Sequence, residues 1–495
     1  MKRVSAGLRP LIAIDKDNSN PMYRQLYDWF RSAILNGQLR PGQRLPSSRC
    51  LASELKVSRI TILSAFEELS AEGYLMGSGG SGTYVARSIP DHLTRFASGN
   101  LEAKIRPPRS DRSIRISQLA ARVLEFRQPP FHLETFRVGL PALDLFPINS
   151  WLRLLNRHWR QEKKEMMAYS DPMGYRPCRE AIAEYLGLVR GVRCEPSQVM
   201  IVSGSQQGLE ISARILLDPG DPVWIEEPGY PGARRAFTSA GAQLVSVPVD
   251  SDGLDVKEGI KRCPNAPAAY ITPSHQFPLG MTMTVSRRML LLDWAARNGS
   301  WIIEDDYDSD YVFDKPPVRV VQGLDADARV IYVGTFSKIL FPSLRVGYLV
   351  LPVDLIPVFS RVRDALDICP STLYQAVLTD FIREGHLARH IRRMRVLYME
   401  RHHVLTAEIQ KQFGASVELV SGEAGMHLVM LLPSGVQDTI VWQNATKAGI
   451  SSWPLSFCYQ KEPPRGGLIL GYGGVDRNQI QAGVKKLAAV IREAI

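Results

Sequence analysis

Hydrophobic positions repeat with two different periods along this chain of 495 residues, and the change falls near residue 132. Before that point, apolar side chains return every three or four residues, as at Leu26, Phe30 and Ile34. This spacing predicts short amphipathic helices. After that point, short apolar runs alternate with helical or turn segments. The pattern therefore predicts a helical N-terminal part and a larger part in which strands and helices alternate.

The N-terminal part predicts three short helices and a hairpin. Serines stand where helix N-caps are expected, and glycines stand where helices end. The N-cap candidates are Ser47 or Ser48 for the second helix and Ser58 for the third, and the C-terminal stops are Gly37 and Gly73. The runs "YLM" and "TYV" then flank the glycine-rich "GSGGSG", which predicts a two-stranded wing.

Three short helices and a wing form a winged helix-turn-helix, whose third helix places its N-terminal residues against base edges in the major groove. The first turn of that helix offers the donors Ser58, Arg59 and Thr61. Arg59 can pair bidentately with guanine, whereas Arg49 and the wing amides can hold phosphates. The wing residues concerned are Gly80, Ser81 and Gly82. The alternative is a small helical domain whose arginines are only solvated.

Residues 21–86 closely resemble the GntR-type DNA-binding domain, whose pattern "LPSSR–LA–L–VSR–T–A–L–EGYL–GSGT-V" is present here. The resemblance implies that residues 1–86 bind a double-stranded DNA operator. Two positions depart from the pattern, because Ile60 and Leu63 stand where relatives often carry polar residues. The third helix is therefore expected to offer fewer base contacts.

The net charge of +10 is unevenly distributed. Residues 1–131 carry 20 Lys and Arg against 11 Asp and Glu, whereas residues 132–495 carry 40 against 39. A basic N-terminal quarter favours a polyanionic partner. Within it, residues 87–131 combine prolines and basic residues with weak periodicity, which predicts a basic linker. That linker either follows the DNA backbone or is a plain tether.

The composition, 45% hydrophobic and 22% charged, suits a globular protein with a large core. Six scattered cysteines without a C-x-x-C pair favour reduced thiols over a disulfide framework or a zinc site. No apolar run approaches the ~20 residues of a membrane span, and the N-terminus lacks the apolar core of a signal peptide. We therefore expect a soluble, cytoplasmic protein.

The larger part, residues 132–495, contains seven short apolar runs of strand type. They are "QVMIV", "PVWIE", "LVSVPV", "AAYIT", "SWIIE", "RVIYV" and "VGYLV". Such runs are typical of a sheet that is buried on both faces in an α/β domain. Ligands of these domains bind at the carboxyl ends of the strands, and the polar motifs of this chain fall there.

Two of these motifs offer an anion site and a flat surface. "SGSQQGLEISARIL" opens a helix, where Gly204 lets the backbone approach closely and the amides of Ser205 and Gln206 can face an anion. "EEPGYPG" holds Tyr230 in a rigid turn, where its ring can support a planar ligand. Each motif alone is more often structural.

Two further motifs supply a carboxylate and an amine. "IIEDDYDSDY" ends a buried strand with acidic residues, among them Asp305, and continues with Tyr307. A carboxylate there can be a loop residue, a metal ligand or the partner of a protonated ring nitrogen, and its neighbours do not complete a metal set. "GTFSKILFPSLRVGY" places Lys338 close to two hydroxyls and a guanidinium. These are Thr335, Ser337 and Arg345.

An anion site, an aromatic platform, a carboxylate and a lysine, each at a strand end, are the parts that hold pyridoxal 5′-phosphate. The Lys338 amine forms the Schiff base, helped by desolvation and nearby cations that favour its neutral form. The aspartate keeps the pyridine nitrogen protonated. Arg345 and the Gly204–Gln206 turn neutralise the phosphate. The sequence therefore predicts pyridoxal phosphate as the cofactor.

Residues 132–495 resemble the fold-type-I aminotransferases, and the whole chain resembles the MocR-type regulators, in which a GntR-type domain is fused to such a fold. The resemblance rests on the motifs above together with "YSDPMGYRPCREAIAEYL" and "TPSHQFPLG". It implies an N-terminal winged helix-turn-helix domain followed by an α/β domain with a mostly parallel sheet and a smaller C-terminal α/β subdomain.

The resemblance also implies roles for individual residues. Asp305 pairs with the ring nitrogen, Tyr307 reaches the ring oxygen and Tyr230 stacks on the pyridine. The phosphate is held by Ser205, Gln206, Thr335 and Arg345. Tyr169 reaches the cofactor of the partner subunit, because this fold builds its sites at a homodimer interface. "SHQFPLG" replaces the asparagine-proline stretch of true aminotransferases, so His275 and Gln276 are candidate pocket residues.

One departure concerns the substrate. Relatives that bind amino acids carry an arginine two residues before the Gly-aromatic pair of the last strand, where it holds the substrate carboxylate. In "GGLILGYGG" that position is Ile469, whose side chain cannot pair with a carboxylate. Productive transamination is therefore expected to be weak, because the substrate would be poorly oriented.

Three classes of function fit these features. The first is a transcription regulator that senses a small molecule through its cofactor domain, either pyridoxal phosphate itself, which the loss at Ile469 favours, or an amino compound. The second is a working aminotransferase with a DNA-binding appendage. The third is a regulator whose second domain has lost the cofactor and only dimerises. The complete cofactor set disfavours the third class, and Ile469 disfavours the second. The resemblance implies that cofactor sensing would regulate vitamin B6 supply, and the sensing of gamma-aminobutyrate, taurine or a dipeptide is the competing role in the family.

Overall fold

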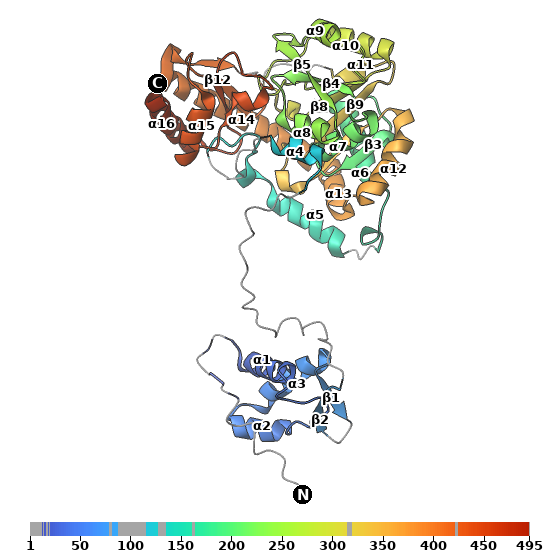
Figure 1. The fold of residues 1–495 in the computed structure, drawn as a ribbon, viewed down its shortest axis with the longest axis vertical. Coiled ribbons are helices and arrows are strands. Elements are labelled where there is room, and N and C mark those ends of the chain that lie inside the picture. The colour runs from blue at the N-terminus through green and yellow to red at the C-terminus, as the bar shows by residue number, and fades with distance from the viewer. Residues whose placement is uncertain are drawn as a thin grey trace. The chain divides into compact units, whose positions relative to one another are not determined.

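In the computed structural model the chain forms two compact units, Met1–Ile114 and Arg115–Ile495 (Figure 1). The structure describes residues 12, 14, 15, 18, 20–78, 82–87, 115–126, 135–160, 164–313, 319–420 and 424–494. Each unit has its own hydrophobic core, as an independently folding domain requires.

The smaller unit contains three helices and a two-stranded antiparallel hairpin, as the sequence predicts. They are α1 (Met22–Leu35), α2 (Ser48–Leu55), α3 (Arg59–Ala71), β1 (Leu75–Ser78) and β2 (Gly82–Val85). The second and third helices begin at serine caps: the Ser47 hydroxyl accepts from the Cys50 amide, and the Ser58 hydroxyl accepts from the Thr61 amide. The apolar stripes of the three helices meet in one buried cluster.

The larger unit is built around an eight-stranded sheet. In spatial order its strands are β3 (Val199–Val202), β10 (Gly347–Val350), β9 (Val330–Thr335), β8 (Trp301–Asp306), β7 (Ala268–Ile271), β4 (Pro222–Glu227), β5 (Gln243–Asp250) and β6 (Gly253–Leu254). From β9 to β5 the strands run parallel, whereas β10 is antiparallel to both of its neighbours. All seven strands predicted from the apolar runs are confirmed.

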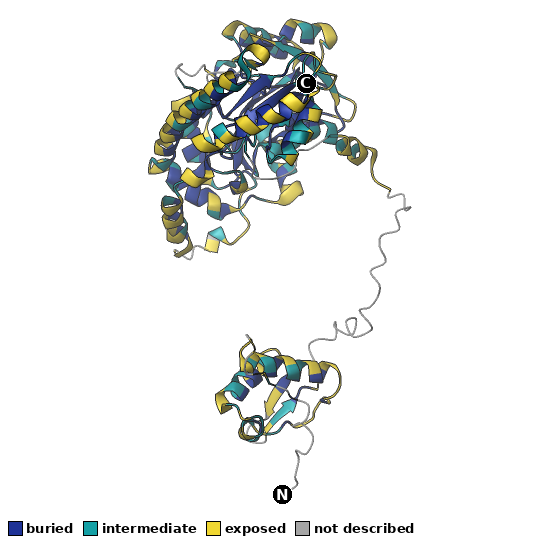
Figure 2. Cartoon of the chain, turned by 90° about the vertical axis from the view of Figure 1, so that its left-hand side faces the viewer, coloured by how far each residue is buried: buried dark blue, intermediate teal, exposed yellow. Residues whose placement is uncertain are grey.

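Helices surround this sheet, and Figure 2 shows its strands buried beneath helices whose outer faces are exposed. They are α5 (Ile148–Arg160), α6 (Arg176–Arg190), α7 (Ser205–Leu216), α8 (Pro231–Ser239), α9 (Val256–Arg262), α10 (Val285–Asn298), α11 (Val321–Leu324), α12 (Ile356–Asp367) and α13 (Thr372–Arg383). Burial on both faces explains why the strands are continuously apolar rather than alternating.

A smaller α/β subdomain follows, as predicted. Its antiparallel sheet has the order β11 (Glu418–Val420), β12 (His427–Leu431), β14 (Gly467–Gly471) and β13 (Trp453–Pro454). Its helices are α14 (His386–Phe413), α15 (Asp438–Lys447) and α16 (Arg477–Ala494). Within the described residues, no helix combines the length and the apolar character that a membrane span needs.

Within the described part of the range predicted as a linker there is a helix, so that part is not a plain tether. Residues 118–124 form α4 (Gln118–Leu124). The Ser117 hydroxyl caps this helix by accepting a hydrogen bond from the Ala120 amide at 3.1 Å. This helix packs against α8 and belongs to the larger unit. The ranges 88–114 and 127–134, which contain most of the predicted linker, lie outside the described residues.

The sheet topology positions the predicted chemistry. Parallel strands present their carboxyl ends at one edge, so Asp305 at the end of β8 and Thr335 at the end of β9 come together. The loop after β3 leads to Ser205 at the start of α7, and the loop after β4 carries Tyr230. Motifs that are far apart in the sequence therefore meet at one place.

Candidate functional site

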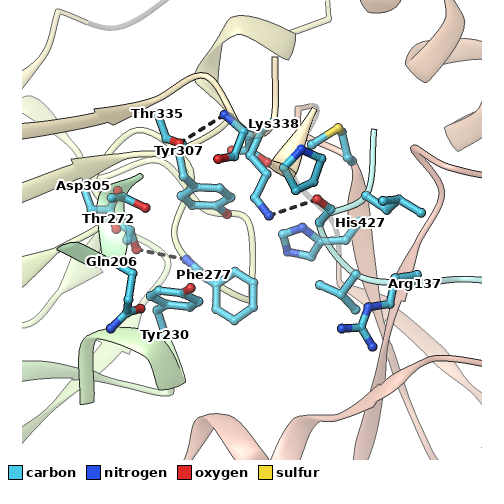
Figure 3. Close-up of a pocket in the computed structure, with 18 of the residues that line it drawn as sticks. Arg137, Gln206, Tyr230, Thr272, Phe277, Asp305, Tyr307, Thr335, Lys338 and His427 are labelled. Atoms are coloured by element: carbon cyan, nitrogen blue, oxygen red, sulfur yellow. Dashed lines mark hydrogen bonds between the residues drawn. The ribbon is translucent and has the colours of Figure 1, made fainter. Parts of the chain in front are cut away.

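A cavity of about 450 Å³ lies at this edge of the sheet (Figure 3). The predicted residues that line it are Ser205, Gln206, Tyr230, Asp305, Tyr307, Thr335, Ser337, Lys338 and Arg345. A volume of this size suits a small ligand or cofactor.

Lys338 projects into the cavity from the loop after β9 (Figure 3). Its Nζ donates to the Gly139 carbonyl at 2.9 Å. Burial lowers the pKa of the Lys338 amine, while the charges of Asp308 and Asp305 act in the opposite direction. A lowered pKa favours the neutral amine, which is the nucleophilic form.

Asp305 stands at the inner end of the cavity with its carboxyl group buried. Its Oδ2 accepts from the Tyr270 hydroxyl at 2.8 Å, whereas its Oδ1 has no hydrogen-bond partner among the described residues. Burial raises the pKa of this carboxyl to about 7. A buried acceptor without a partner is costly, and a protonated ring nitrogen would satisfy it.

An anion cradle lies around the start of α7. Gly204, with a φ of +82°, stands at the N-cap, and a Cβ built there would lie 2.8 Å from the guanidinium of Arg345. Arg345 donates to the Ser203 carbonyl, which holds its guanidinium beside the helix N-terminus. The helix dipole, the guanidinium and the Thr335 and Ser337 hydroxyls together suit a phosphate.

Aromatic rings form the walls between these polar groups. Tyr230 and Phe277 meet edge to face with ring centroids 5.4 Å apart. The Tyr307 hydroxyl lies 3.1 Å from His275 Nδ1, on the side of the cavity that faces Lys338. A buried acceptor, a helix N-terminus, a buried amine and an aromatic platform are the groups that pyridoxal phosphate requires, so these residues fit that cofactor.

His275 and Gln276 do not belong to the described residues that line the cavity. Gln276 Nε2 donates to the carbonyls of Pro228 and Phe277, at 2.8 and 2.7 Å, and so holds two loops together. His275 Nδ1 lies 2.9 Å from Asp308 Oδ1. Phe277, in the same loop as Gln276, is the residue of "SHQFPLG" that lines the cavity. The two predicted residues therefore support the wall from behind.

Tyr169 also lies away from the cavity lining. Its side chain is 82% exposed and follows a 3₁₀ turn after α5. Gln206, although it lines the cavity, donates its Nε2 to the Gly232 carbonyl at 2.9 Å, which leaves its backbone amide as the group that can face an anion.

Two charged residues of the cavity were not predicted. Asp308, three residues after Asp305, is buried, and its Oδ2 has no hydrogen-bond partner within the described part of the chain. Arg137 enters from the segment before α5 (Figure 3). The acidic run "DDYDSDY" contains a signal for Asp308, whereas no motif marks Arg137.

Ile469 lies on β14 with its side chain fully buried. It belongs to an apolar cluster with Phe277 and Val429, against which Tyr230 and Trp453 pack. Because Phe277, Tyr230 and Trp453 all line the cavity, Ile469 supports its apolar wall. The position at which the sequence comparison leads us to expect a carboxylate-binding arginine is thus part of a hydrophobic cluster.

Of the described residues predicted to bind DNA, Arg49, Ser58, Arg59 and Gly82 are exposed on the surface of the smaller unit, and Thr61 is half-buried. Arg59 opens α3, and its Nε donates to the Ser48 hydroxyl at 3.3 Å, which ties it to α2. The Ser58 and Thr61 hydroxyls lie 2.8 Å apart, so they form the cap of α3 as well as a polar surface. Arg49 on α2 is also exposed.

The wing and one apolar residue complete that surface. Gly82 begins β2, while Gly80 and Ser81 lie outside the described residues. Ile60, beside Arg59, is 75% exposed and therefore contributes nothing to the core. An exposed aliphatic side chain at this place can contact only apolar groups, such as the methyl group of thymine.

Comparison with known families finds one match within each of the two units. Residues 22–85 match "Bacterial regulatory proteins, gntR family", and residues 136–463 match "Aminotransferase class I and II". Among solved structures, the kynurenine aminotransferase of Pyrococcus horikoshii, in complex with PMP, is 28% identical with a TM-score of 0.68, over 77% of this chain and 95% of that chain. LysN, the alpha-aminoadipate aminotransferase of Thermus thermophilus, is 26% identical with a TM-score of 0.68, over 76% and 95%.

The fold and the site thus define a GntR-type DNA-binding domain joined to an aminotransferase-like domain. The "Probable rhizopine catabolism regulatory protein MocR" of Rhizobium meliloti is 42% identical over 96% of this chain and 95% of its own length. The chain belongs to the MocR-type family of transcription regulators.

A second relative carries a name that concerns the cofactor. The "HTH-type pyridoxine biosynthesis transcriptional regulator PdxR" of Corynebacterium glutamicum is 29% identical over 95% of this chain and 96% of its own length. The predicted fold class and family are confirmed, and pyridoxal 5′-phosphate is the cofactor of aminotransferases with this fold.

Proposed function

We propose that this protein is a transcription regulator that binds operator DNA through its smaller unit and senses a small molecule through pyridoxal phosphate held in its larger unit. The observation that carries the proposal is that Lys338, Asp305 and the Arg345 cradle line one cavity of the larger unit. The same chain also contains a smaller unit whose third helix begins with Arg59, a candidate for contacting DNA bases. A protein that contacts the chromosome works in the cytoplasm of a bacterium.

The residues of the cavity have distinct parts in this function. Pyridoxal phosphate, when bound, supplies an aldehyde that reacts with primary amines. Lys338 offers the amine that attaches to it, and burial keeps that amine available in its neutral form. Asp305 holds the proton at the ring nitrogen, and Tyr230 orients the ring. Arg345 and the start of α7 bind the phosphate.

The proposal predicts that pyridoxal phosphate alters DNA binding. Adding it to the cofactor-free protein should change operator affinity by a factor of ~5 or more, the smallest coupling usually called allosteric. The measurement is a fluorescence anisotropy titration with an operator selected from a random duplex pool. Equal curves with and without cofactor, together with a normal cofactor absorbance band, would remove sensing from the proposal and leave cofactor binding intact.

We expect the smaller unit to make two kinds of DNA contact, one to bases and one to phosphates. Arg59→Ala should weaken binding to the selected operator by about 1–3 kcal/mol and relax base preference, because Arg59 opens the helix that enters the major groove. Arg49→Ala, on the neighbouring helix, should weaken binding uniformly across sequences. Both variants are compared on the operator and on random duplex. Equal losses of Arg59→Ala on the two duplexes would make it a phosphate contact.

We also infer that the larger unit forms a homodimer, which would place Tyr169 at the interface. Large side chains are unusually exposed along α5 and the segment after it. They include Ile148, Trp159, Met167 and Tyr169, at 51, 67, 73 and 82%. Apolar surface of this kind favours association. Light scattering should give twice the mass of the chain, and a monomer at micromolar concentration would contradict the inference.

A working aminotransferase is the competing function. Ile469 gives the last strand no guanidinium for a substrate carboxylate, and the smaller unit would have no part in catalysis. Multiple turnovers with an amino acid and a keto acid would favour that alternative, whereas a single, non-catalytic reaction with the bound cofactor favours the regulator.

A further inference from the structure

The cavity extends beyond the groups that fit the cofactor. Figure 3 shows Gln206 and Asp305 on one side and Arg137 on the opposite side, with Lys338 between them. The cavity lining also includes the apolar residues Val138, Leu140, Met426 and Trp453, together with His427, which lies on the same side as Arg137 in Figure 3. The cation of Arg137 therefore lines the same cavity as the reactive lysine, close enough for its charge to act on that amine.

The backbone of Arg137 is fixed against the strand that carries Ile469. The Gly471 amide donates to the Phe136 carbonyl at 3.0 Å, and a Cβ at Gly471 would lie 2.2 Å from the Arg137 carbonyl oxygen. Alternate residues of a strand share a face, so Gly471 lies on the same face of β14 as Ile469. The absent side chain of Gly471 makes room for the segment that brings Arg137 to the cavity.

Arg137 also affects the reactive amine. Burial is the main reason that the pKa of Lys338 is lowered, and the positive charge of Arg137 lowers it further. Partial burial lowers the pKa of the Arg137 guanidinium itself, although the group stays charged at neutral pH. A guanidinium in such a place binds a planar anion through two parallel hydrogen bonds.

We propose that Arg137 binds the carboxylate of the effector, an interaction that the aliphatic side chain of Ile469 cannot make. The effector is then an amino acid with a primary amine, whose acid group lies at Arg137 and whose amine is directed to the Lys338 side of the cavity. The aliphatic part between the two groups contacts Met426 and Trp453. This inference rests on the proposed function, and it replaces the expectation, drawn from Ile469 alone, that the cofactor itself is the effector.

The test uses matched probes on the cofactor-loaded protein. Straight-chain ω-amino acids of two to six carbons are compared with alkylamines of the same lengths by titration calorimetry. The natural protein should bind at least one amino acid tenfold or more tightly than its matched amine, and the same amino acid should shift operator affinity. Arg137→Gln should lower the affinity for the amino acid to that for the matched alkylamine, and it should leave the affinity for the alkylamine unchanged. Arg137→Lys should retain part of the preference for the amino acid, because lysine keeps the positive charge but lacks the paired donors of the guanidinium.

The outcomes separate this inference from the proposed function. A natural protein that binds each alkylamine as tightly as its amino acid would overturn the role of Arg137, as would an Arg137→Gln variant that keeps the full preference. Neither result would affect the proposed function, which is tested separately by the cofactor absorbance band, by the response of operator binding to the cofactor and by the absence of multiple turnovers. Thermal melting of each variant shows whether it is folded, and a missing preference in the natural protein would overturn the role of Arg137 even if a variant is not.

Discussion

Replacing Lys338 with alanine should abolish covalent attachment of pyridoxal phosphate while the protein remains folded. Borohydride reduction followed by peptide mass analysis should find the cofactor mass on Lys338 in the natural protein and on no peptide of the variant. The fold should survive, because the substitution removes one hydrogen bond, to the Gly139 carbonyl, worth about 1 kcal/mol, together with a desolvated amine.

An exposed lysine supplies the matched control for this experiment. Lys257 on α9 is exposed, and Lys257→Ala should leave the reduced adduct unchanged. A borohydride-fixed cofactor on Lys338→Ala would show that another lysine carries the chemistry. That result would remove Lys338 from the proposed function, because the cavity would then hold the cofactor through another amine.

Replacing Asp305 with asparagine should stabilise the cofactor-free protein at neutral pH and weaken its hold on the cofactor. Burial raises the pKa of Asp305 to about 7, well above the value of an exposed aspartate. A carboxyl group whose pKa is raised by folding destabilises the fold where it is ionised. The stability of the natural protein therefore falls as pH rises from ~4 to 7, and asparagine removes this loss.

The expected gain for cofactor-free Asp305→Asn at pH 7.5 is at least ~1 kcal/mol in the free energy of unfolding, shrinking toward pH 4. Urea denaturation at pH 5 and pH 7.5 measures it, with the exposed Asp327→Asn as control. In the presence of the cofactor the natural protein should be the more stable of the two, because asparagine cannot match the charge of a protonated ring nitrogen. The affinity of Asp305→Asn for the cofactor should therefore fall by ~10–100-fold. A variant less stable than the natural protein at pH 7.5 would show that Asp305 is ionised and satisfied without the cofactor.

Secondary structure could be predicted from the sequence wherever local pattern decides it. Strands such as β3, β9 and β10 are buried on both faces, so each is a continuous apolar run bounded by turn residues, whereas β5 is only partly buried. The helices of the smaller unit were predictable from their caps, since Ser47 and Ser58 each satisfy an amide of the first turn. Helix α4 was missed because it is short and isolated within a polar, basic stretch.

The cavity was predictable only in part, for a different reason. Lys338, Asp305 and Tyr230 stand at strand ends, so the topology of a parallel sheet brings them together. In "SHQFPLG" the order of residues does not tell which side chain faces the cavity, and Phe277 rather than His275 does so. Arg137 reaches the cavity through packing of its backbone on β14, more than 300 residues later in the chain, which no local pattern reports.

The cavity takes its lining from residues between Arg137 and Trp453, nearly the whole of the larger unit. During synthesis, therefore, cofactor uptake has to wait until the ribosome has made residue 453, whereas the residues of α1 to β2 have long since emerged and can fold. A nascent or prematurely terminated chain would carry a folded DNA-contacting domain without the means to sense a ligand. If the protein has the proposed function, the order of the two units along the gene would thus allow truncated products that escape proteolysis to bind DNA without regulation by a ligand.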